Sequence, residues 1–313
     1  MTVNNSLTKS NSNKKLGLTA YLTQDAVKNR IAKVVGGKDG TRFISSVVSA
    51  TQTNPALQEC TNASILSAAL LGESLKLSPS PQLGQYYMVP YNDKKRGKVA
   101  TFQLGYKGYL QLAIRSGQYK KLNVLAIKEG ELVRYDPLNE EIEVNLIEDE
   151  EERENAPTIG YYAFFEYTNG FRKALYWSKN KMIAHADKYS AAFSKDATND
   201  RYPKVSFADF EAGNYPEKDA WLYSSFWYKD FDGMAYKTML RQLISKWGIM
   251  SIELQTAISN DMAVINEDGT ATYVETDDNV VADVEPVEAE AAEEPKEASQ
   301  EEPKAAANEG NLF

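Results

Sequence analysis

Basic side chains and aromatic rings are interleaved along residues 86–128, and this mixture suits the binding of a single strand of nucleic acid. The stretch holds nine Lys or Arg residues, seven aromatic residues and one acid, Asp93, within 43 residues. Cations neutralise phosphates and flat rings stack on bases, so together they favour a single-strand site. The same composition also fits a basic, solvated surface with tyrosines half buried beneath it, and composition alone leaves both interpretations open.

A hairpin is expected to carry the first cations of this stretch. Residues 86–91 and 98–104 are typical of strands, and the loop between them contains Gly97, which can adopt a positive φ. Pro90 cannot donate a ladder hydrogen bond, which favours an edge strand. The loop also contains Lys95 and Arg96, so the sequence predicts a hairpin with a basic tip.

Two helices are expected to present further cations. Residues 106–118 predict a helix with Ile114 facing inward, on which Lys107 and Arg115 lie about 12 Å apart, a span of about two phosphates. Residues 231–247 predict a second helix whose apolar stripe includes Trp247.

On the second helix, Lys237 and Arg241 stand four residues apart beside the apolar stripe. Like charges at that spacing repel, so an anionic partner such as a phosphate would offset them. The alternative is a pair of solvated cations whose stems cover the core.

Charge is distributed unevenly along the chain, whose formal net charge is −9. Residues 267–313 hold 15 acids and two lysines, net −13, and residues 140–154 hold nine acids and one arginine, net −8. Because these segments together carry −21 of the total, the remaining residues carry +12. A basic body of this kind is expected of a phosphate-binding protein.

Several kinds of catalytic and metal site are disfavoured. No phosphate-binding GxxxxGK[ST] loop occurs, so no nucleotide cofactor is expected. The single cysteine, Cys60, is expected to be a small buried residue. The single histidine, His185, is expected to be structural or near the surface, rather than catalytic, within a helix at 179–189. No metal site is expected either. No apolar run approaches 18 residues and the N-terminus is polar, so we expect a cytoplasmic protein without membrane segments.

The pattern of elements predicts an α+β fold, with antiparallel hairpins packed against helices. Residues 1–18 are expected to be disordered, residues 19–266 to form the binding and self-association domain, and residues 267–313 to form a disordered acidic tail. Residues 148–154 are expected to form a loop or a hairpin tip, and residues 178–216 a second basic and aromatic region that is mostly loop. The other elements are expected as helices at 23–35, 42–51 and 63–77, strands at 122–135 and 141–147, and a hairpin at 159–168 and 171–177 with a type I′ Asn169-Gly170 turn.

Three blocks of sequence occur in a characteristic order: LGESLKLSPSPQLGQYYMVPYN (71–92), FQLGYKGYLQLAIRSGQYKKL (102–122) and FDGMAYKTMLRQLISKWGIMS (231–251). In this order they resemble the RecT/Redβ family of phage single-strand annealing recombinases, and the match runs through most of residues 20–260. The resemblance implies ATP-independent annealing of complementary DNA strands by an oligomer, either a ring or a helical filament.

DNA-binding candidates follow from the basic and aromatic regions together with these blocks. They are Lys95, Arg96, Gln103, Tyr106, Lys107, Tyr109, Arg115, Lys181, Lys188, Lys204, Lys237 and Arg241.

The expected partners are single-stranded DNA, the annealed duplex and further copies of the chain, with the helices of residues 23–77 as subunit contacts. A phage exonuclease or a host single-strand binding protein is a further candidate partner, through residues 267–313. Two other function classes stay open from the residues alone: a metal-dependent nuclease, and a scaffold protein whose basic surface binds an acidic partner.

Overall fold

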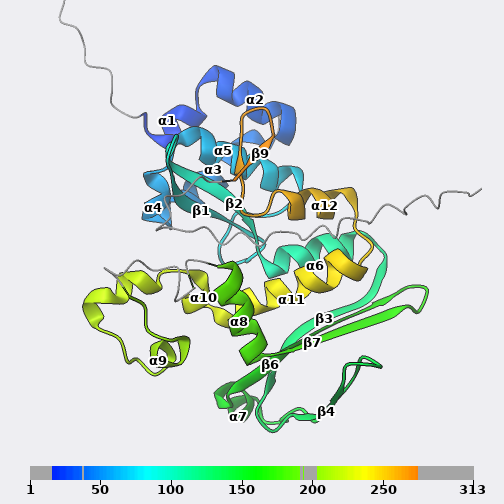
Figure 1. Ribbon diagram of the computed structural model, residues 1–313. Coiled ribbons are helices and arrows are strands. Elements are labelled where there is room, and N and C mark those ends of the chain that lie inside the picture. Colours follow the sequence, from blue (N-terminus) through cyan, green and yellow to red (C-terminus); the bar gives the residue numbers. More distant parts are fainter. Residues whose placement is uncertain (1–15, 37–38, 191–192, 194–202, 274–313) are drawn as a thin grey trace, which may run out of the picture.

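One helix, α11 (Phe231–Trp247), runs through the middle of the fold and is buried on both sides (Figure 1). Leu240 and Ile244 of α11 join a core formed with the N-terminal helices, whereas Met239 and Leu243 join a second core beneath the largest sheet. The fold is therefore α+β, as the sequence predicts, with two cores that share one helix. The computed structural model describes residues 16–36, 39–190, 193 and 203–273.

The first core, which we call the upper core, lies at the top of Figure 1. Its central helix, α5, is buried on nearly all sides, because its small and apolar residues let neighbours approach from every direction. Cys60 is fully buried beside it, as predicted. The elements of this half are α1 (Leu18–Leu22), α2 (Asp25–Val35), α3 (Gly40–Gln52), α4 (Pro55–Gln58), α5 (Asn62–Ser74), β1 (Tyr86–Asp93), β2 (Gly97–Leu104), α12 (Ile252–Ser259), β8 (Val264–Ile265) and β9 (Ala271–Thr272).

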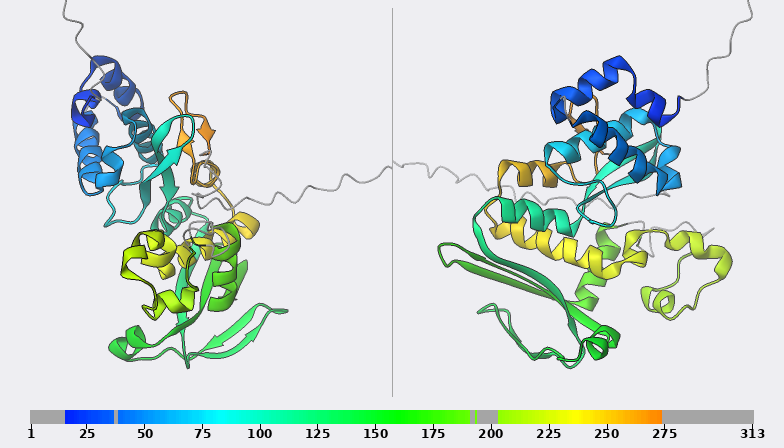
Figure 2. Two further views of the ribbon diagram at one scale, coloured as in Figure 1. Left: turned by 60° about the vertical axis from the view of Figure 1, so that its left-hand side comes forward. Right: turned by 180° about the vertical axis from the view of Figure 1, so that it is seen from behind.

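The second core, which we call the lower core, lies against a three-stranded antiparallel sheet with the order β3–β6–β7. Ala163 and Phe165 of β6 are fully buried on the inner face, where α8 and α11 cover the sheet. Helix α6 (Tyr106–Arg115) packs beside α11 between the two cores, as both views of Figure 2 show. The remaining elements here are β3 (Tyr119–Lys128), β6 (Thr158–Tyr167), β7 (Arg172–Ser178), α8 (Lys179–Tyr189), α9 (Phe207–Glu211), the 3₁₀ helix η1 (Glu217–Tyr223) and α10 (Phe226–Lys229).

A two-stranded hairpin, β4 (Leu132–Asp136) with β5 (Glu141–Val144), projects from the bottom of the body in Figures 1 and 2. We call residues 132–144 the arm. Its base is fixed by the fully buried Glu131, which accepts a 2.6 Å hydrogen bond from Arg153 in α7 (Glu150–Asn155). Burial alone would raise the pKa of Glu131, but hydrogen bonds from Arg153 and two backbone N–H groups outweigh it and lower that pKa.

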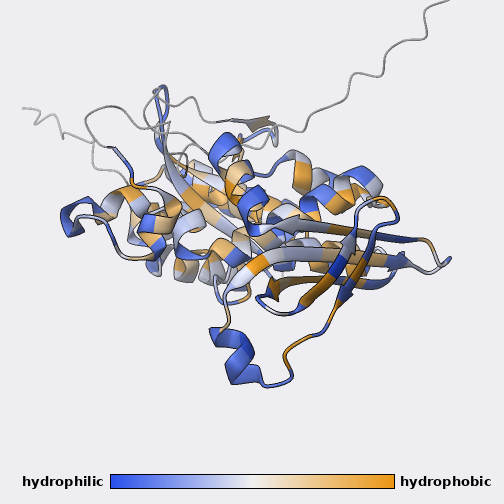
Figure 3. Cartoon of the chain, turned by 60° about the horizontal axis from the view of Figure 1, so that its bottom comes forward, coloured by the Kyte–Doolittle hydropathy of each residue, from blue (hydrophilic) through white to orange (hydrophobic). Residues whose placement is uncertain are grey.

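Two predicted elements differ from the structure in number or kind, and the helix predicted over 106–118 ends at Arg115. The strand predicted over 122–135 is two strands, because the chain reverses at Gly130, whose φ is +85°. The segment 148–154, predicted as a loop or a hairpin tip, contains helix α7, which begins where the Asp149 carboxylate accepts a hydrogen bond from the Glu152 N–H. α7 is the hydrophilic helix that projects at the bottom of Figure 3, and none of its residues is buried.

The Asn-Gly turn between β6 and β7 is present, but it is not the predicted type I′ turn. Gly170 has a φ of +88°, whereas Asn169 is not among the residues with positive φ. The Gly170 N–H donates to Tyr167, and the Asn169 side chain accepts a hydrogen bond from the Phe171 N–H. Only one of the two turn residues therefore needs the left-handed conformation that a type I′ turn requires of both.

Two apolar side chains predicted to face the core are exposed instead: Ile114 at 60% and Trp247 at 51%.

At the predicted boundary between the domain and the acidic tail, the chain remains part of the fold past residue 266, because β9 pairs with β8. The remainder of the expected tail, 274–313, lies outside the described residues, as do residues 1–15 of the expected N-terminal segment. Within 178–216, α8 occupies its predicted bounds and α9 is an added helix.

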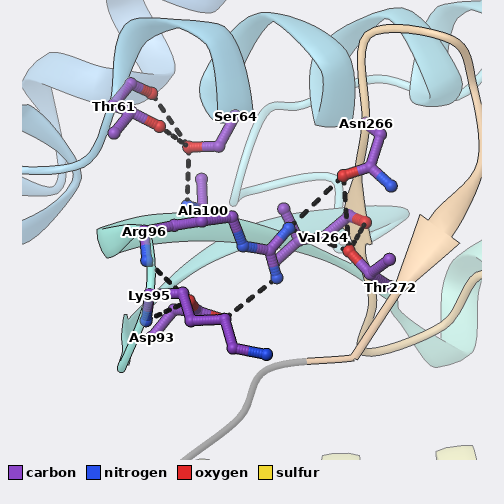
Figure 4. Close-up of polar contacts among 9 residues, drawn as sticks. All are labelled: Thr61, Ser64, Asp93, Lys95, Arg96, Ala100, Val264, Asn266 and Thr272. Carbon is purple, nitrogen blue, oxygen red and sulfur yellow. Dashed lines mark hydrogen bonds and ion pairs between the residues drawn. The ribbon is translucent and has the colours of Figure 1, made fainter.

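The tip of the β1–β2 hairpin is fastened to the β8–β9 pair by Arg96 (Figure 4). The guanidinium donates to Asp93 at 3.0 Å, to Thr272 at 2.8 Å and to Asn266 at 3.3 Å. Asp93 also accepts the backbone N–H groups of Lys95 and Arg96. Burial alone would raise the pKa of Asp93, but these hydrogen bonds bring it down to about 2.

We expect Asp93→Asn to destabilise the fold at neutral pH by an amount that vanishes in acid. The folded-state pKa lies below the ordinary value of 3.8, so the ionised carboxylate contributes stability above about pH 4 that is lost as the pH falls towards about 2. Urea unfolding of both proteins between pH 2 and 7 measures the difference in unfolding free energy. A difference that stays constant over this range would contradict the assignment.

Candidate nucleic-acid interface

Lys237 and Arg241, one turn apart on α11, are not solvated cations on the flank of the helix. Each residue is only 8% exposed, and both side chains bind the carboxylate of Asp261. The Lys237 Nζ lies 3.0 Å from the Asp261 Oδ2, and an Arg241 guanidinium nitrogen lies 3.1 Å from the same oxygen. Asp261 itself is fully enclosed. Since two cations share this carboxylate, the three groups together carry a charge of +1.

The other oxygen of Asp261 accepts a 2.8 Å hydrogen bond from the backbone N–H of Leu104 at the end of β2. This bond matters because it fixes α11 to the strand that leads into α6. The carboxylate therefore joins three segments that are far apart in the sequence: the end of β2, the middle of α11 and the turn after α12. The buried hydrogen bonds and ion pairs of Asp261 therefore fix the relative positions of these segments more firmly than flexible surface contacts would.

Two adjoining pockets open over these cations, and both are lined by Met234 and Lys237. The first, which we call the α6 pocket, lies between the start of α6 and the start of α11, and its other lining residues are Tyr87, Gln103, Leu104, Gly105, Tyr106, Phe226, Asp230 and Gly233. The second, which we call the α8 pocket, lies against the end of α8, and its other lining residues are Ala186, Tyr189, Ser190, Trp227, Thr238, Arg241 and Met262.

The α6 pocket has aromatic walls with a lysine at its rim. The rings of Tyr87 and Phe226 lie 5.5 Å apart, and the Lys107 ammonium lies 5.9 Å from the centre of the Tyr106 ring. Lys107 is exposed, so it can reach a ligand without moving the fold. The backbone comes very close here: a Cβ on Gly105 would lie 2.2 Å from the carbonyl oxygen of Gly84, so glycine is required for internal packing.

The α8 pocket pairs a lysine with a ring in a similar way. The Lys188 ammonium lies 4.6 Å from the centre of the Tyr189 ring and 2.8 Å from the hydroxyl oxygen of that tyrosine. Ser190 lines the same pocket, and its buried hydroxyl has no hydrogen-bond partner in the part of the chain that the structure describes. A buried hydroxyl without a partner is costly, so this pocket has an unused polar group beside its cations.

Three of the sequence-based candidates lie away from these pockets. Lys95 and Arg96 are at the far tip of the β1–β2 hairpin, where Arg96 is engaged in the contacts described above. Arg115 is at the opposite end of α6 from Lys107, and its guanidinium donates 2.7 Å to the carbonyl of Leu75. It therefore caps the last turn of α5, where a cation also favours the helix dipole.

Four further candidates differ in exposure. Tyr109 is fully buried in the upper core, and Gln103 is 6% exposed with its amide donating 3.2 Å to the Tyr91 hydroxyl. Lys204 is 8% exposed, with its ammonium 5.9 Å from the centre of the Tyr228 ring. Lys181 is exposed near the start of α8, where it lies over the Trp177 ring at 4.6 Å.

One charged cluster was not among the candidates. Glu166 on β6, with a side chain 5% exposed, lies 2.6 Å from Lys120, 4.0 Å from Lys121 and 3.0 Å from Arg172. Hydrogen bonds from Lys120 and Arg172 lower the pKa of Glu166 to about 2. Strand pairing brings these groups together, since Lys121 and Arg172 flank Glu166 in the ladder. The paired lysines next to a predicted strand were the only sequence signal for it.

Two other kinds of feature are absent from the described residues. No group of three or more His, Cys, Asp or Glu side chains there is arranged to hold a metal ion. Among the helices that the structure describes, none combines the length and the apolar character needed to cross a membrane.

Comparison with known proteins gives consistent matches along the chain. The model of the RecT family matches residues 41–279. The protein YqaK of Bacillus subtilis (strain 168) is 37% identical over 282 residues, which cover 89% of this chain and 83% of that protein. Protein RecT of Escherichia coli (strain K12) is 26% identical over 247 residues, which cover 77% of this chain and 79% of that protein.

We expect Asp261→Asn to destabilise the fold by about 3–5 kcal/mol, because it leaves two buried cations without their shared carboxylate. The substitution keeps an oxygen that can accept the Leu104 N–H, so the loss reports mainly on charge. The free energy of unfolding, measured in urea at neutral pH, checks this. Asp25→Asn, an exposed change of the same kind at the start of α2, should shift it by no more than about 1 kcal/mol, because it weakens only an interaction with the helix dipole. Equal effects of the two substitutions would disprove the role of Asp261.

Proposed function

Because this chain belongs to the RecT family, we propose that it binds single-stranded DNA and anneals complementary strands without a nucleotide cofactor. The family suggests a single-strand annealing protein that acts in recombination. The observation that carries the proposal is the pair of adjoining pockets, with aromatic walls and rim lysines, above the cations of α11.

The proposed path of the DNA strand runs along these two pockets. Lys107 and Lys188 lie at the rims and neutralise phosphates, while the rings of Tyr106 and Tyr189 beside them offer faces on which bases can stack. Lys237 lines both pockets and gives the path a positive floor. Contacts of this kind hold the backbone without reading its sequence, so selectivity comes from base pairing with the second strand.

The remaining candidates take different roles in the proposal. Tyr109 and Gln103 support the pocket wall from within and touch the strand little. Lys181 extends the positive surface around α8, whereas the largely buried Lys204 contributes its charge from within. Lys95, Arg96 and Arg115 meet DNA only where the strand leaves the pockets, because they lie at the far ends of their elements.

Annealing is proposed to be the work of several copies lying along one strand. The two small pockets of one copy contact only a short part of a strand, so a long strand needs neighbouring subunits to keep its bases extended and accessible. Delivery to fresh single strands, through an exonuclease or a host single-strand binding protein held by residues 267–313, is a further part of the proposal, although most of that segment lies outside the described residues.

We expect Lys107→Ala to weaken single-strand binding and to reduce the slope of log affinity against log salt by about 0.7, the loss of one phosphate contact. Fluorescence anisotropy with a short oligonucleotide, repeated over a range of salt concentrations, measures both quantities. Lys218→Ala, which removes another exposed lysine, on η1, serves as the matched control. If the slope falls equally in both variants, or in neither, the strand does not follow the α6 pocket.

We also expect complementary oligonucleotides to pair faster with the protein present, and at the same rate with or without ATP. Annealing requires positioned strands and neutralised phosphates but no bond cleavage, so hydrolysis adds nothing to the reaction. Quenching of a fluorophore on one strand by its complement follows the rate. An acceleration that appears only with ATP would refute this part of the proposal.

A further inference from the structure

Exposed apolar side chains gather at one end of the molecule, where the ends of α6 and α11 meet the start of α12. Six of them, which we call the apolar shelf, are Ile114, Phe171, Trp247, Ile249, Met250 and Ile252, with exposures from 37% to 81%. The loop after α11 is held rigidly in place: the Tyr167 hydroxyl donates to the Trp247 carbonyl at 3.1 Å, and the Tyr119 hydroxyl donates to the Ile249 carbonyl at 3.0 Å. The shelf is therefore a fixed surface.

Cations border the apolar shelf. Lys120, Lys121 and Arg172 gather around Glu166 at the neighbouring end of the sheet and are each more than half exposed. The three cations and the single carboxylate of Glu166 give this border a net charge of +2. Arg115 adds a positive charge next to Ile114 and close enough to Glu253 in α12 to lower the pKa of that acid, although hydrogen bonds at the helix start contribute more.

The arm has the opposite character. Leu138 at its tip is 88% exposed, the highest value among the exposed large apolar side chains of the described chain. Acids surround it, namely Asp136, Glu140, Glu141 and Glu143, with Arg134 as the only basic residue of the arm. An exposed leucine on an acidic hairpin fits an apolar surface with a basic border. Leu138 and the acids of the arm would be ill suited to DNA, because phosphates repel carboxylates.

We propose that the arm of one copy docks on the apolar shelf of a neighbouring copy, with Leu138 against Trp247 and Ile252. This inference rests on the self-association in the proposed function and assigns its surfaces. Eight of the fifteen exposed large apolar side chains of the described residues lie on the arm or the shelf, a concentration typical of an interface. The basic border suits the acids of the arm, and the exposed apolar side chains of the shelf favour the arm, which carries Leu138, over DNA.

The geometry of one copy makes such a contact reachable for its neighbour. Glu140 of the arm binds Lys173, and the Lys173 ammonium lies 3.5 Å from the centre of the Trp247 ring in the same copy. The arm and the shelf are thus adjacent, so a copy placed alongside brings its own arm over this shelf after a small displacement. Two different surfaces meet in this contact, so it can repeat from copy to copy without closing.

Two charged variants separate the surfaces. Leu138→Glu has a defective arm and an intact shelf, whereas Ile252→Glu has an intact arm and a defective shelf. Sedimentation without DNA should show each variant unable to form the assemblies of the wild type. An equimolar mixture, sedimented without DNA, should form pairs that stop at two copies, since only one productive arm-to-shelf contact is available. Both side chains are exposed, so unfolding curves should match the wild type; Leu138→Ser and Ile252→Ser replace either variant that does not.

Val34→Glu is the matched control. Val34 is 45% exposed on α2 and belongs to the helices that the sequence suggests as subunit contacts. The Val34→Glu variant is expected to assemble like the wild type. Assembly lost in Val34→Glu and retained in the other two variants would overturn the inference and place the contact on those helices.

Binding of a short oligonucleotide keeps the two proposals distinguishable. Unchanged affinity of both arm and shelf variants, together with their failure to assemble, supports both proposals. Variants that assemble like the wild type refute only the arm-to-shelf contact. A wild-type protein that binds short DNA but never self-associates refutes the contact and the oligomeric part of the proposed function, while leaving DNA binding itself intact.

Discussion

The buried carboxylate of Asp261 is the interaction on which the rest of the structure depends. Removing charges from water is expensive, and Lys237 and Arg241 can occupy the centre of the fold only because this acid compensates them. The same carboxylate receives the N–H that ends β2, so the strand, α11 and α6 share one fixed point. The pockets, their aromatic walls and the rim lysine on α6 all take their positions from it. A ligand phosphate would thus enter a site whose cations are already ordered.

Elements with a strong local signal could be predicted from the sequence. The helix 231–247 has its predicted bounds because its apolar period is regular and Asp230 caps its start, and the β6–β7 hairpin follows from Asn169-Gly170 between two β-rich runs. Lys237 and Arg241 of α11 were also identified from the sequence, together with their need for an anionic partner. The identity of that anion was not, because Asp261 is 20 residues beyond Arg241 and lies in no recognisable pattern.

The remaining differences arise where tertiary contacts override local preference. Gly130 divides one predicted strand because Glu131 is drawn inward to Arg153, an ion pair that no periodicity reveals. Among the basic candidates, Lys107 is exposed beside a pocket, Lys237 is buried in an ion pair and Arg115 caps a helix, differences that depend on tertiary contacts and not on local sequence. Ile114 and Trp247 satisfy helical periodicity yet remain exposed. Periodicity identifies the side of a helix on which apolar residues gather, but it does not show whether another part of the same chain covers them.

The contacts made by Arg96 have a consequence for how the chain is made. The β1–β2 hairpin is completed only by residues 263–272: Phe102 bridges Ala263, and Arg96 and Arg30 bind the loop and strand that follow. During synthesis these residues leave the ribosome long after the helices they complete. The upper core therefore stays incomplete until residues 263–272 have been synthesised, whereas domains with local contacts can fold as they emerge. An interrupted translation product would lack the part that closes the fold.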